Sequence, residues 1–456
     1  MSLMTRSAPR ASGAVPPTLR YNLAMRVRFD GLWRHPDFVK LWTGQTISVF
    51  GSLITGTALP FTAILTLDAS PLEVALLAAA NHVPGLVFGV PAGVWVDRLR
   101  RRPVMIAADL GRAALVVSIP LAYAFDALAM WQLYAVALSA GGLTIFFDVA
   151  YQSYLPVLVS RDELIEGNSK LAATASVSEF AGFSVSGWLV QVFSGPVAML
   201  VDAVSFVISA VFLRAIRTPE PAPVPPEARA GALSEAAEGM RAVLRDPLLR
   251  SLAGAMPLAA FGTGMFFATY MIFVTRGLGF DPGVLGVMFG LGGISSLCGA
   301  MVAGGAARRF GAGPAMIAGL AMMGVSMLFI PIARGATVVA AALLIAQQIS
   351  GDGMFMVFDI NATSLRQAIA PGPMLGRVNA FNRMLELGFT LAGILLGGAI
   401  GQTAGLRPAL YIGASSMLAA AVCLLVSPVR KVAAAPAQDE PLATALDPAL
   451  PHPPIV

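Results

Sequence analysis

The chain has 456 residues, of which 57% are hydrophobic and only 12% are charged, and its formal net charge is +5. Soluble domains carry roughly 25% charged residues, and no soluble block in this chain is large enough to hold an enzyme. The basic residues are spread over many short loops, which argues against a nucleic-acid partner. We therefore expect the lipid bilayer to be the main solvent of this protein.

The first residues of the chain, 1–36, are polar and proline-rich, without the apolar region of a cleavable signal peptide. We expect them to form a cytoplasmic tail, with the first span acting as the insertion signal. Beyond this tail, apolar segments long enough to cross the hydrocarbon core, about 20 residues each, recur along the chain. The first six predict helices over 41–67, 72–96, 104–125, 131–156, 171–193 and 197–213.

A polar stretch over 217–250 interrupts the apolar segments. It contains the sequence PEPAPVPPE and then a charged segment around 234–245, which indicates an amphipathic surface helix within a cytoplasmic linker. Six further spans follow, over 252–274, 284–307, 315–333, 338–365, 378–402 and 409–426. The sequence thus predicts two six-helix units, 37–216 and 251–427, and a disordered cytoplasmic tail over 428–456.

The placement of lysine and arginine tests this topology, because cytoplasmic loops carry the positive excess. With the N-terminus inside, the outer loops hold only Arg276, Arg334 and Arg407. The inner loops hold Arg98, Arg100, Arg101, Arg102, Arg161, Lys170, Arg214, Arg217, Arg229, Arg241, Arg245, Arg250, Arg308, Arg309, Arg366, Arg377 and Arg383. We expect a multi-pass protein of the bacterial cytoplasmic (inner) membrane with both termini in the cytoplasm.

The two units are similar to each other at a shift of 211 residues. The polar pairs at this shift are Asp148 with Asp359, Ser153 with Ser364, and Asn168 with Asn379. A shift that spans six helices preserves orientation, so the repeat is parallel, about an axis along the membrane normal. We therefore predict an all-α polytopic membrane protein of twelve helices in two parallel-related bundles, with a central path between them.

The loop after the second span reads GVWVDRLRRR from Gly93 to Arg102, and it resembles the G-x-x-x-D-R-x-G-R-[RK] signature of the major facilitator superfamily. It departs from the signature at Arg100, where the family usually has glycine. The segments 146–171 and 202–206 resemble the branch that holds siderophore exporters and macrolide efflux proteins. The resemblance covers all twelve spans and implies secondary active transport by alternating access.

The charged residues of this loop are candidates for an inner gate. Asp97 can face the N-terminus of a neighbouring helix, and Arg101 can reach a carboxylate such as Asp148. Arg98 and Arg102 belong to the same signature, although the positive-inside rule alone would also explain arginines here. The matching loop of the second unit has Arg308 near the position of the acid, so the second gate is degenerate.

Glycines recur in the fifth and eleventh spans. Gly182 and Gly187 resemble, without its proline, the G-P-x-x-G-G pattern of proton-antiport exporters, and Gly393, Gly397 and Gly398 repeat it in the second unit. Small residues also let helices pack closely, so plain helix packing explains these glycines equally well.

Ionisable groups inside the membrane are costly, at least about 2.5 to 3.5 kcal/mol each on insertion scales, so each one needs a reason. Glu179, Asp352 and Glu386 are candidate proton or substrate carriers, and His82 is a secondary candidate that a simple buried hydrogen bond would also explain. We expect Asp109 and Arg112, on one face of the third span, to pair with each other or with the gate loop, and Asp202 to serve packing or capping. Aromatic and methionine side chains over 265–288 suit an apolar pocket or ordinary packing.

These features favour proton-coupled export of a small amphipathic molecule, such as a drug or a siderophore, by a monomer without cofactor or metal. An importer, a uniporter or a non-transporting receptor is the alternative. An enzyme is disfavoured, because the sequence has no HExxH, GxxxxGK[ST] or CxxC motif. Cys298 and Cys423 both lie in apolar segments and are expected to act as small hydrophobic residues.

Overall fold

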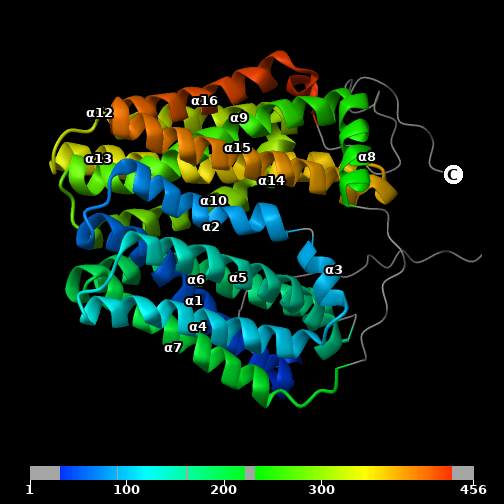
Figure 1. Ribbon diagram of the computed structural model, residues 1–456. Coiled ribbons are helices and arrows are strands. Elements are labelled where there is room, and N and C mark those ends of the chain that lie inside the picture. Colours follow the sequence, from blue (N-terminus) through cyan, green and yellow to red (C-terminus); the bar gives the residue numbers. More distant parts are fainter. Residues whose placement is uncertain (1–30, 90, 161–162, 221–231, 434–456) are drawn as a thin grey trace, which may run out of the picture.

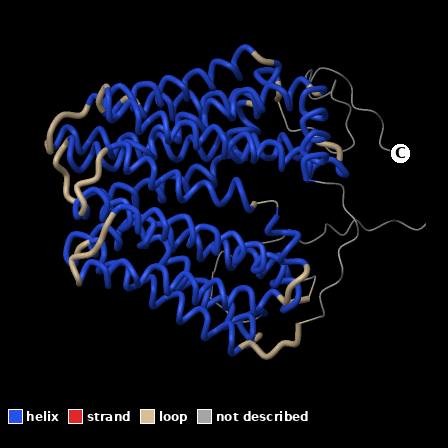
Figure 2. The backbone as a smooth tube through the Cα atoms, in the orientation of Figure 1, coloured by secondary structure: helices blue, strands red, loops and turns tan. Residues whose placement is uncertain are grey.

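The computed structural model describes residues 31–89, 91–160, 163–220 and 232–433 of the chain. Within these ranges all regular structure is helical, without any strand (Figure 1 and Figure 2). The expected all-α class is therefore confirmed. The helices of the N-terminal half are α1 (Pro36–Phe61), α2 (Pro71–Phe88), α3 (Pro91–Asp97), α4 (Arg101–Ala124), α5 (Met130–Leu158), α6 (Leu164–Phe193) and α7 (Gly195–Ala215).

A short amphipathic helix, α8 (Ala232–Arg245), leads into the C-terminal half. The helices of that half are α9 (Pro247–Ile272), α10 (Pro282–Phe310), α11 (Ala312–Met327), α12 (Phe329–Ile332), α13 (Val338–Gln347), α14 (Gly353–Ile369), α15 (Leu375–Thr403) and α16 (Leu406–Val426). Single π-helical turns extend α1 as η2 (Thr62–Thr66), extend α9 as η4 (Phe273–Gly277) and join α13 to α14 as η5 (Gln348–Asp352).

Eleven helical segments in the described residues are long and apolar enough to cross a membrane. The remaining long helix, α6, has 30 residues and is therefore long enough to cross a membrane. It is not among the eleven because it is more polar than they are. It nevertheless packs inside the bundle, against α1 and α10. Twelve long helical segments therefore form the bundle, as the sequence predicts.

Proline and capping residues determine several helix boundaries. Ser70 and Glu73 form a capping box at the start of α2, with Pro71 in the first turn. The expected span 72–96 is not one helix, because α2 ends at Phe88 and α3 begins at Pro91. Proline lacks the N–H that would continue the helix and clashes with the preceding turn, which explains this break.

The sequence repeat is also a structural repeat. The π-turns η2 and η4 begin 211 residues apart, as do α2 and α10, and α5 and α14 end 211 residues apart. Helix contacts repeat in the same way: α1 packs on α6 and α7, and α9 packs on α15 and α16. Each half is thus the same bundle of helices, as expected for a parallel repeat.

The halves contact each other through α6 with α10, α2 with α15, and α2 with α9. Their closest contacts lie at the end of the bundle that holds η2, η4 and Arg276, which we call the Arg276 end. A large buried cluster there joins Phe61 and Phe206 of the first half to Tyr270 and Leu285 of the second. Figure 1 shows the halves diverging toward the opposite end, which we call the α8 end.

Candidate functional site

Two equivalent helix crossings bring the halves together at the Arg276 end. A Cβ atom on Gly187 of α6 would overlap the carbonyl oxygen of Pro282 and lie 2.7 Å from the Cα atom of Gly286. A Cβ atom on Gly398 of α15 would overlap the Cβ atom of Ala75 in α2. Both partners of the first crossing lie 211 residues from those of the second. The structure therefore uses these two glycines for close contact between the halves.

The other predicted glycines lie elsewhere. Gly182 packs against Leu53 of α1, and Gly393 packs against α9, so both serve contacts within one half. Gly397 also faces α9, where a Cβ atom would lie 3.1 Å from that of Ala268. A Cβ atom on Gly93 would meet nothing within 4 Å.

Arg276 joins the halves directly at this end. Its guanidinium lies 2.5 Å from a carboxylate oxygen of Asp68. It also donates hydrogen bonds to the carbonyl oxygens of Ala69, at 2.7 Å, and Ile64. Sequence reasoning assigned Arg276 only to an outer loop, because the loop of the other half that it binds lies about 210 residues away in sequence and no local signal relates the two.

Two predicted acids lie near each other across the two halves. Glu179 is in the middle of α6 and is exposed, whereas Asp352 ends the π-turn η5 and is half-buried. Their carboxyl groups are close enough to interact electrostatically. A Cβ atom on Gly292 would overlap the Asp352 carboxylate, so the missing side chain in α10 leaves room for this acid.

An amide and aromatic rings surround Asp352. The Gln348 side chain lies beside Gly292 and donates to the carbonyl oxygen of Met288 at 3.3 Å. The buried Tyr270 also interacts electrostatically with Asp352, and its hydroxyl makes no hydrogen bond to the described residues. Polar groups are thus gathered around one acid at mid-membrane depth, next to a π-turn of the kind often found at functional sites.

The aromatic residues form a continuous cluster between α6, α9 and α10. The rings of Phe266 and Tyr270 stack at 4.4 Å, Tyr270 lies 5.6 Å from Phe289, and Phe289 lies 5.7 Å from Phe183. Phe183 belongs to the N-terminal half and the other three to the C-terminal half. The predicted apolar stripe in α9 therefore packs across the interface between the halves.

The remaining ionisable candidates are paired locally. The Nδ1 atom of His82 lies 2.9 Å from the carbonyl oxygen of Ala78, and its ring lies 5.8 Å from that of Phe267 in α9. Glu386 lies 3.5 Å from Arg383 and also interacts electrostatically with Arg366. Glu386 is thus the one of the three acids that lies beside two guanidinium groups of its own half.

The gate residues lie at the α8 end. Arg98 is exposed, and the side chain of Asp97 lies outside the described part of the structure. Arg101 does reach a carboxylate, but this carboxylate belongs to Glu220 and not to Asp148, the example named from the sequence. Its guanidinium lies 3.9 Å from Glu220, whose carboxylate also accepts the backbone N–H groups of Arg101 and Arg102. Because these N–H groups begin α4, Glu220 is a cap for this helix that local sequence could not reveal.

The carboxylate of Asp148 instead interacts with Arg112, which lies in the same half. Arg112 pairs with Asp109 at 2.5 Å, as expected, and its guanidinium lies 4.5 Å from the ring of Phe147. Asp202 accepts a hydrogen bond from Ser205 at 3.0 Å, in agreement with the expected packing role. These contacts describe a buried structural network that ends at the exposed Asp148.

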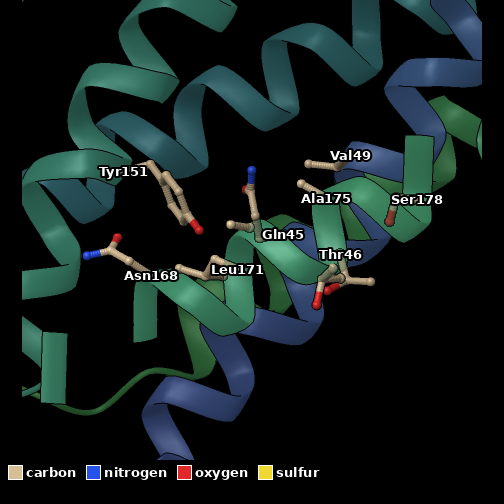
Figure 3. Close-up of a pocket in the computed structure, with 10 residues that line it drawn as sticks. Gln45, Thr46, Val49, Tyr151, Asn168, Leu171, Ala175 and Ser178 are labelled. Carbon is tan, nitrogen blue, oxygen red and sulfur yellow. The ribbon is translucent and has the colours of Figure 1, made fainter. Parts of the chain in front are cut away.

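A pocket of about 300 Å³ lies between α1, α5 and α6, toward the α8 end of the N-terminal half. Figure 3 shows Tyr151 and Asn168 at the left of the view, Gln45 in the centre, and Thr46 and Ser178 at the right. The Oε1 atom of Gln45 is buried without a hydrogen bond to the described residues. Sequence reasoning missed this pocket because it considered ionisable, aromatic and methionine side chains, whereas uncharged amides and hydroxyls within the spans were the available signal.

The fold and this site define a polytopic membrane protein built from two related six-helix halves with a polar centre between them. The family profile described as Major Facilitator Superfamily matches residues 41–386 and 258–454. The chain belongs to the major facilitator superfamily.

Its relatives include several transporters. The chain is 27% identical to the uncharacterized MFS-type transporter YfiS of Bacillus subtilis over 52% of its own length and 53% of that protein. It is 26% identical to Macrolide efflux protein A of Streptococcus pyogenes over 40% of its length and 45% of that protein. These matches span only about half of each relative. The multidrug efflux pump Tap of Mycolicibacterium fortuitum is 27% identical over 82% of this chain and 91% of that pump.

Solved structures share the fold. A bacterial homologue of the iron transporter ferroportin in its inward-facing state has a TM-score of 0.70 and 17% identity, covering 87% of this chain and 99% of that one. A bacterial ferroportin homologue in its outward-facing state has a TM-score of 0.55 and 17% identity. That match covers 85% of this chain and 98% of the other. The family, relatives and structural neighbours described here are transporters and not enzymes.

Proposed function

We propose that this protein exports small amphipathic molecules in exchange for protons, by alternating access, as a monomer in the cytoplasmic membrane of a bacterium. The α8 end then faces the cytoplasm, together with both termini and the linker over 217–250. In the conformation described here the halves are closed at the Arg276 end, which is the arrangement expected of an exporter ready to receive substrate from inside.

The observation that carries the proposal is the acid pair formed by Glu179 and Asp352. Two neighbouring carboxylates at mid-membrane depth repel each other when both are charged, and one bound proton removes this repulsion. The acids belong to different halves, so rocking of the halves changes their separation. Proton binding would therefore favour one arrangement of the halves, and proton release the other.

The surroundings of the pair suit an amphipathic substrate. The aromatic cluster of Phe183, Phe266, Tyr270 and Phe289 offers apolar contacts, and Gln348 and the Tyr270 hydroxyl offer polar ones. Export is favoured over import by the efflux relatives, of which the Tap pump covers most of the chain. The gate role of Asp97 and its neighbouring arginines remains a prediction.

The experiment is proton-driven flux in proteoliposomes, with erythromycin and ethidium as probes. We expect Glu179→Gln and Asp352→Asn to reduce flux driven by a pH gradient at least tenfold, because each keeps the shape of the side chain but cannot titrate. Both variants should retain probe binding and exchange without a gradient.

Glu386→Gln is the matched control, because this acid lies within the membrane-spanning part of α15 but is paired with arginines. It should change flux less than twofold. Undiminished proton-driven flux in both variants of the pair would remove their role. A parent protein that moves neither probe, in either direction, would instead favour the receptor alternative.

A further inference from the structure

Side-chain hydrogen bonds join α6 to α1 at two places, one on either side of the middle of α6. Toward the α8 end the helices are joined by Trp42, whose indole N–H donates to the Thr174 hydroxyl at 2.9 Å. Toward the Arg276 end Ser186 donates to the carbonyl oxygen of Ile54 at 3.2 Å, next to the close approach of Gly182 to α1. Two contact points therefore flank a stretch of both helices.

Thr46 and Ser178 lie in this stretch, and each of them lines two cavities. One is the pocket of about 300 Å³ on the α5 side, which also holds Gln45 and Tyr151. The other is a groove of about 550 Å³ between α1, α6 and α7. The shared residues make the two spaces adjacent, and we call this junction the Thr46 window.

The groove opens on the outer surface of the bundle. Its α7 wall contains Leu200, Val201 and Val204, residues that are 39%, 40% and 56% exposed. Because α7 is an apolar span and these residues lie near its middle, they face the hydrocarbon core of the bilayer. None of the groove residues is ionisable, and Thr46, Ser178 and Ser205 are its only hydroxyl-bearing ones.

Polarity therefore increases from the groove to the pocket. An apolar mouth in the hydrocarbon leads past two hydroxyl groups to an amide and a phenol inside. A hydrophilic solute cannot reach such a mouth, because it does not dissolve in the bilayer core. An amphipathic molecule does reach it, and the combined space has the size of pockets for drug-sized ligands.

We propose that the Thr46 window is a lateral portal through which lipophilic, amphipathic substrates pass from the bilayer into the N-terminal pocket. This proposal rests on the export function proposed above and specifies its substrate class. The rival occupant of the groove is the acyl chain of a lipid that stays in place and blocks the passage.

Labelling of a single cysteine tests the portal without requiring transport. In a background with Cys298→Ala and Cys423→Ala, Val49→Cys places a thiol on the pocket side of the window. N-(1-pyrenyl)maleimide loaded into the lipid of proteoliposomes should label this thiol. Val204→Trp should slow that labelling at least fivefold, because the indole fills the mouth of the groove.

Val211→Trp is the matched control, since Val211 is 62% exposed on the same helix but does not line the groove. Val211→Trp should change the rate of labelling by pyrenylmaleimide less than twofold. A charged, water-soluble maleimide should label Val49→Cys equally fast alone, with Val204→Trp and with Val211→Trp. Absent labelling from the lipid, as a resident acyl chain would cause, overturns the portal, and so do equal rates in the two tryptophan variants. Flux of ethidium in the same proteins is scored separately, so a parent that transports nothing contradicts the export function but not the labelling result.

Discussion

At the scale of single residues, Arg276 shows how backbone acceptors can outweigh an ion pair. Its partner Asp68 has a side chain that is 95% exposed, and pairs of this kind contribute about 0.2 to 1 kcal/mol. Hydrogen bonds from a charged group are stronger, at about 1.5 to 3 kcal/mol each. The hydrogen bonds to the Ala69 and Ile64 carbonyl oxygens therefore contribute more than the ion pair to the link that Arg276 makes between the halves.

We predict that Arg276→Ala opens the Arg276 end at least tenfold more often, which corresponds to the loss of about 1.4 kcal/mol or more. The measurement is labelling of Ala79→Cys, in a background without the native cysteines, by an impermeant maleimide. Ala79 is buried between the halves, with Ala75, Ala268 and Ile394. Asp68→Asn should raise labelling less than fivefold, and an equal effect of both variants would assign the link to the ion pair instead.

At the scale of helices, the glycines of α6 and α15 decide how closely the halves approach. We predict that Gly187→Val reduces flux at least tenfold while insertion and expression stay normal, because its side chain would overlap the Pro282 carbonyl oxygen only when the halves are closed. Gly305→Val is the control, since nothing lies within 4 Å of a Cβ atom there. Normal flux in both variants would contradict the prediction, because it would show that transport does not need the close approach of α6 and α10 at Gly187.

The same scale shows what could be predicted from the sequence. Span positions and the repeat of 211 residues were predictable, because hydrophobicity over about 20 residues and paired polar residues are local signals. The break before Pro91 was readable in principle, since proline ends helices locally. The Glu220 cap on α4 and the Thr46 window were not, because they depend on residues more than 110 positions apart that only tertiary packing brings together.

At the scale of the whole molecule, the distribution of arginine distinguishes the two ends. Two of the three arginines assigned to the outer side are tied to backbone carbonyl oxygens: Arg276 binds Ile64 and Ala69, and Arg407 binds Pro331 and Ala333. They are therefore explained by contacts within the bundle and do not oppose the positive-inside rule. At the α8 end, Arg98, Arg308 and Arg309 are exposed and contribute to the positive excess.

This distribution predicts that the α8 end is cytoplasmic, with an even number of spans between the two termini. Alkaline phosphatase fused at Ala230, in the linker, or after Val456 should be inactive, whereas green fluorescent protein at the same two positions should fluoresce. Phosphatase inserted after Gly335, between α12 and α13, is the matched control and should be active, because that loop lies at the Arg276 end. Active phosphatase at Ala230 would show that the protein has the opposite orientation in the membrane. The proposed export would then become import, because the end toward which the halves diverge in Figure 1 would face the outside.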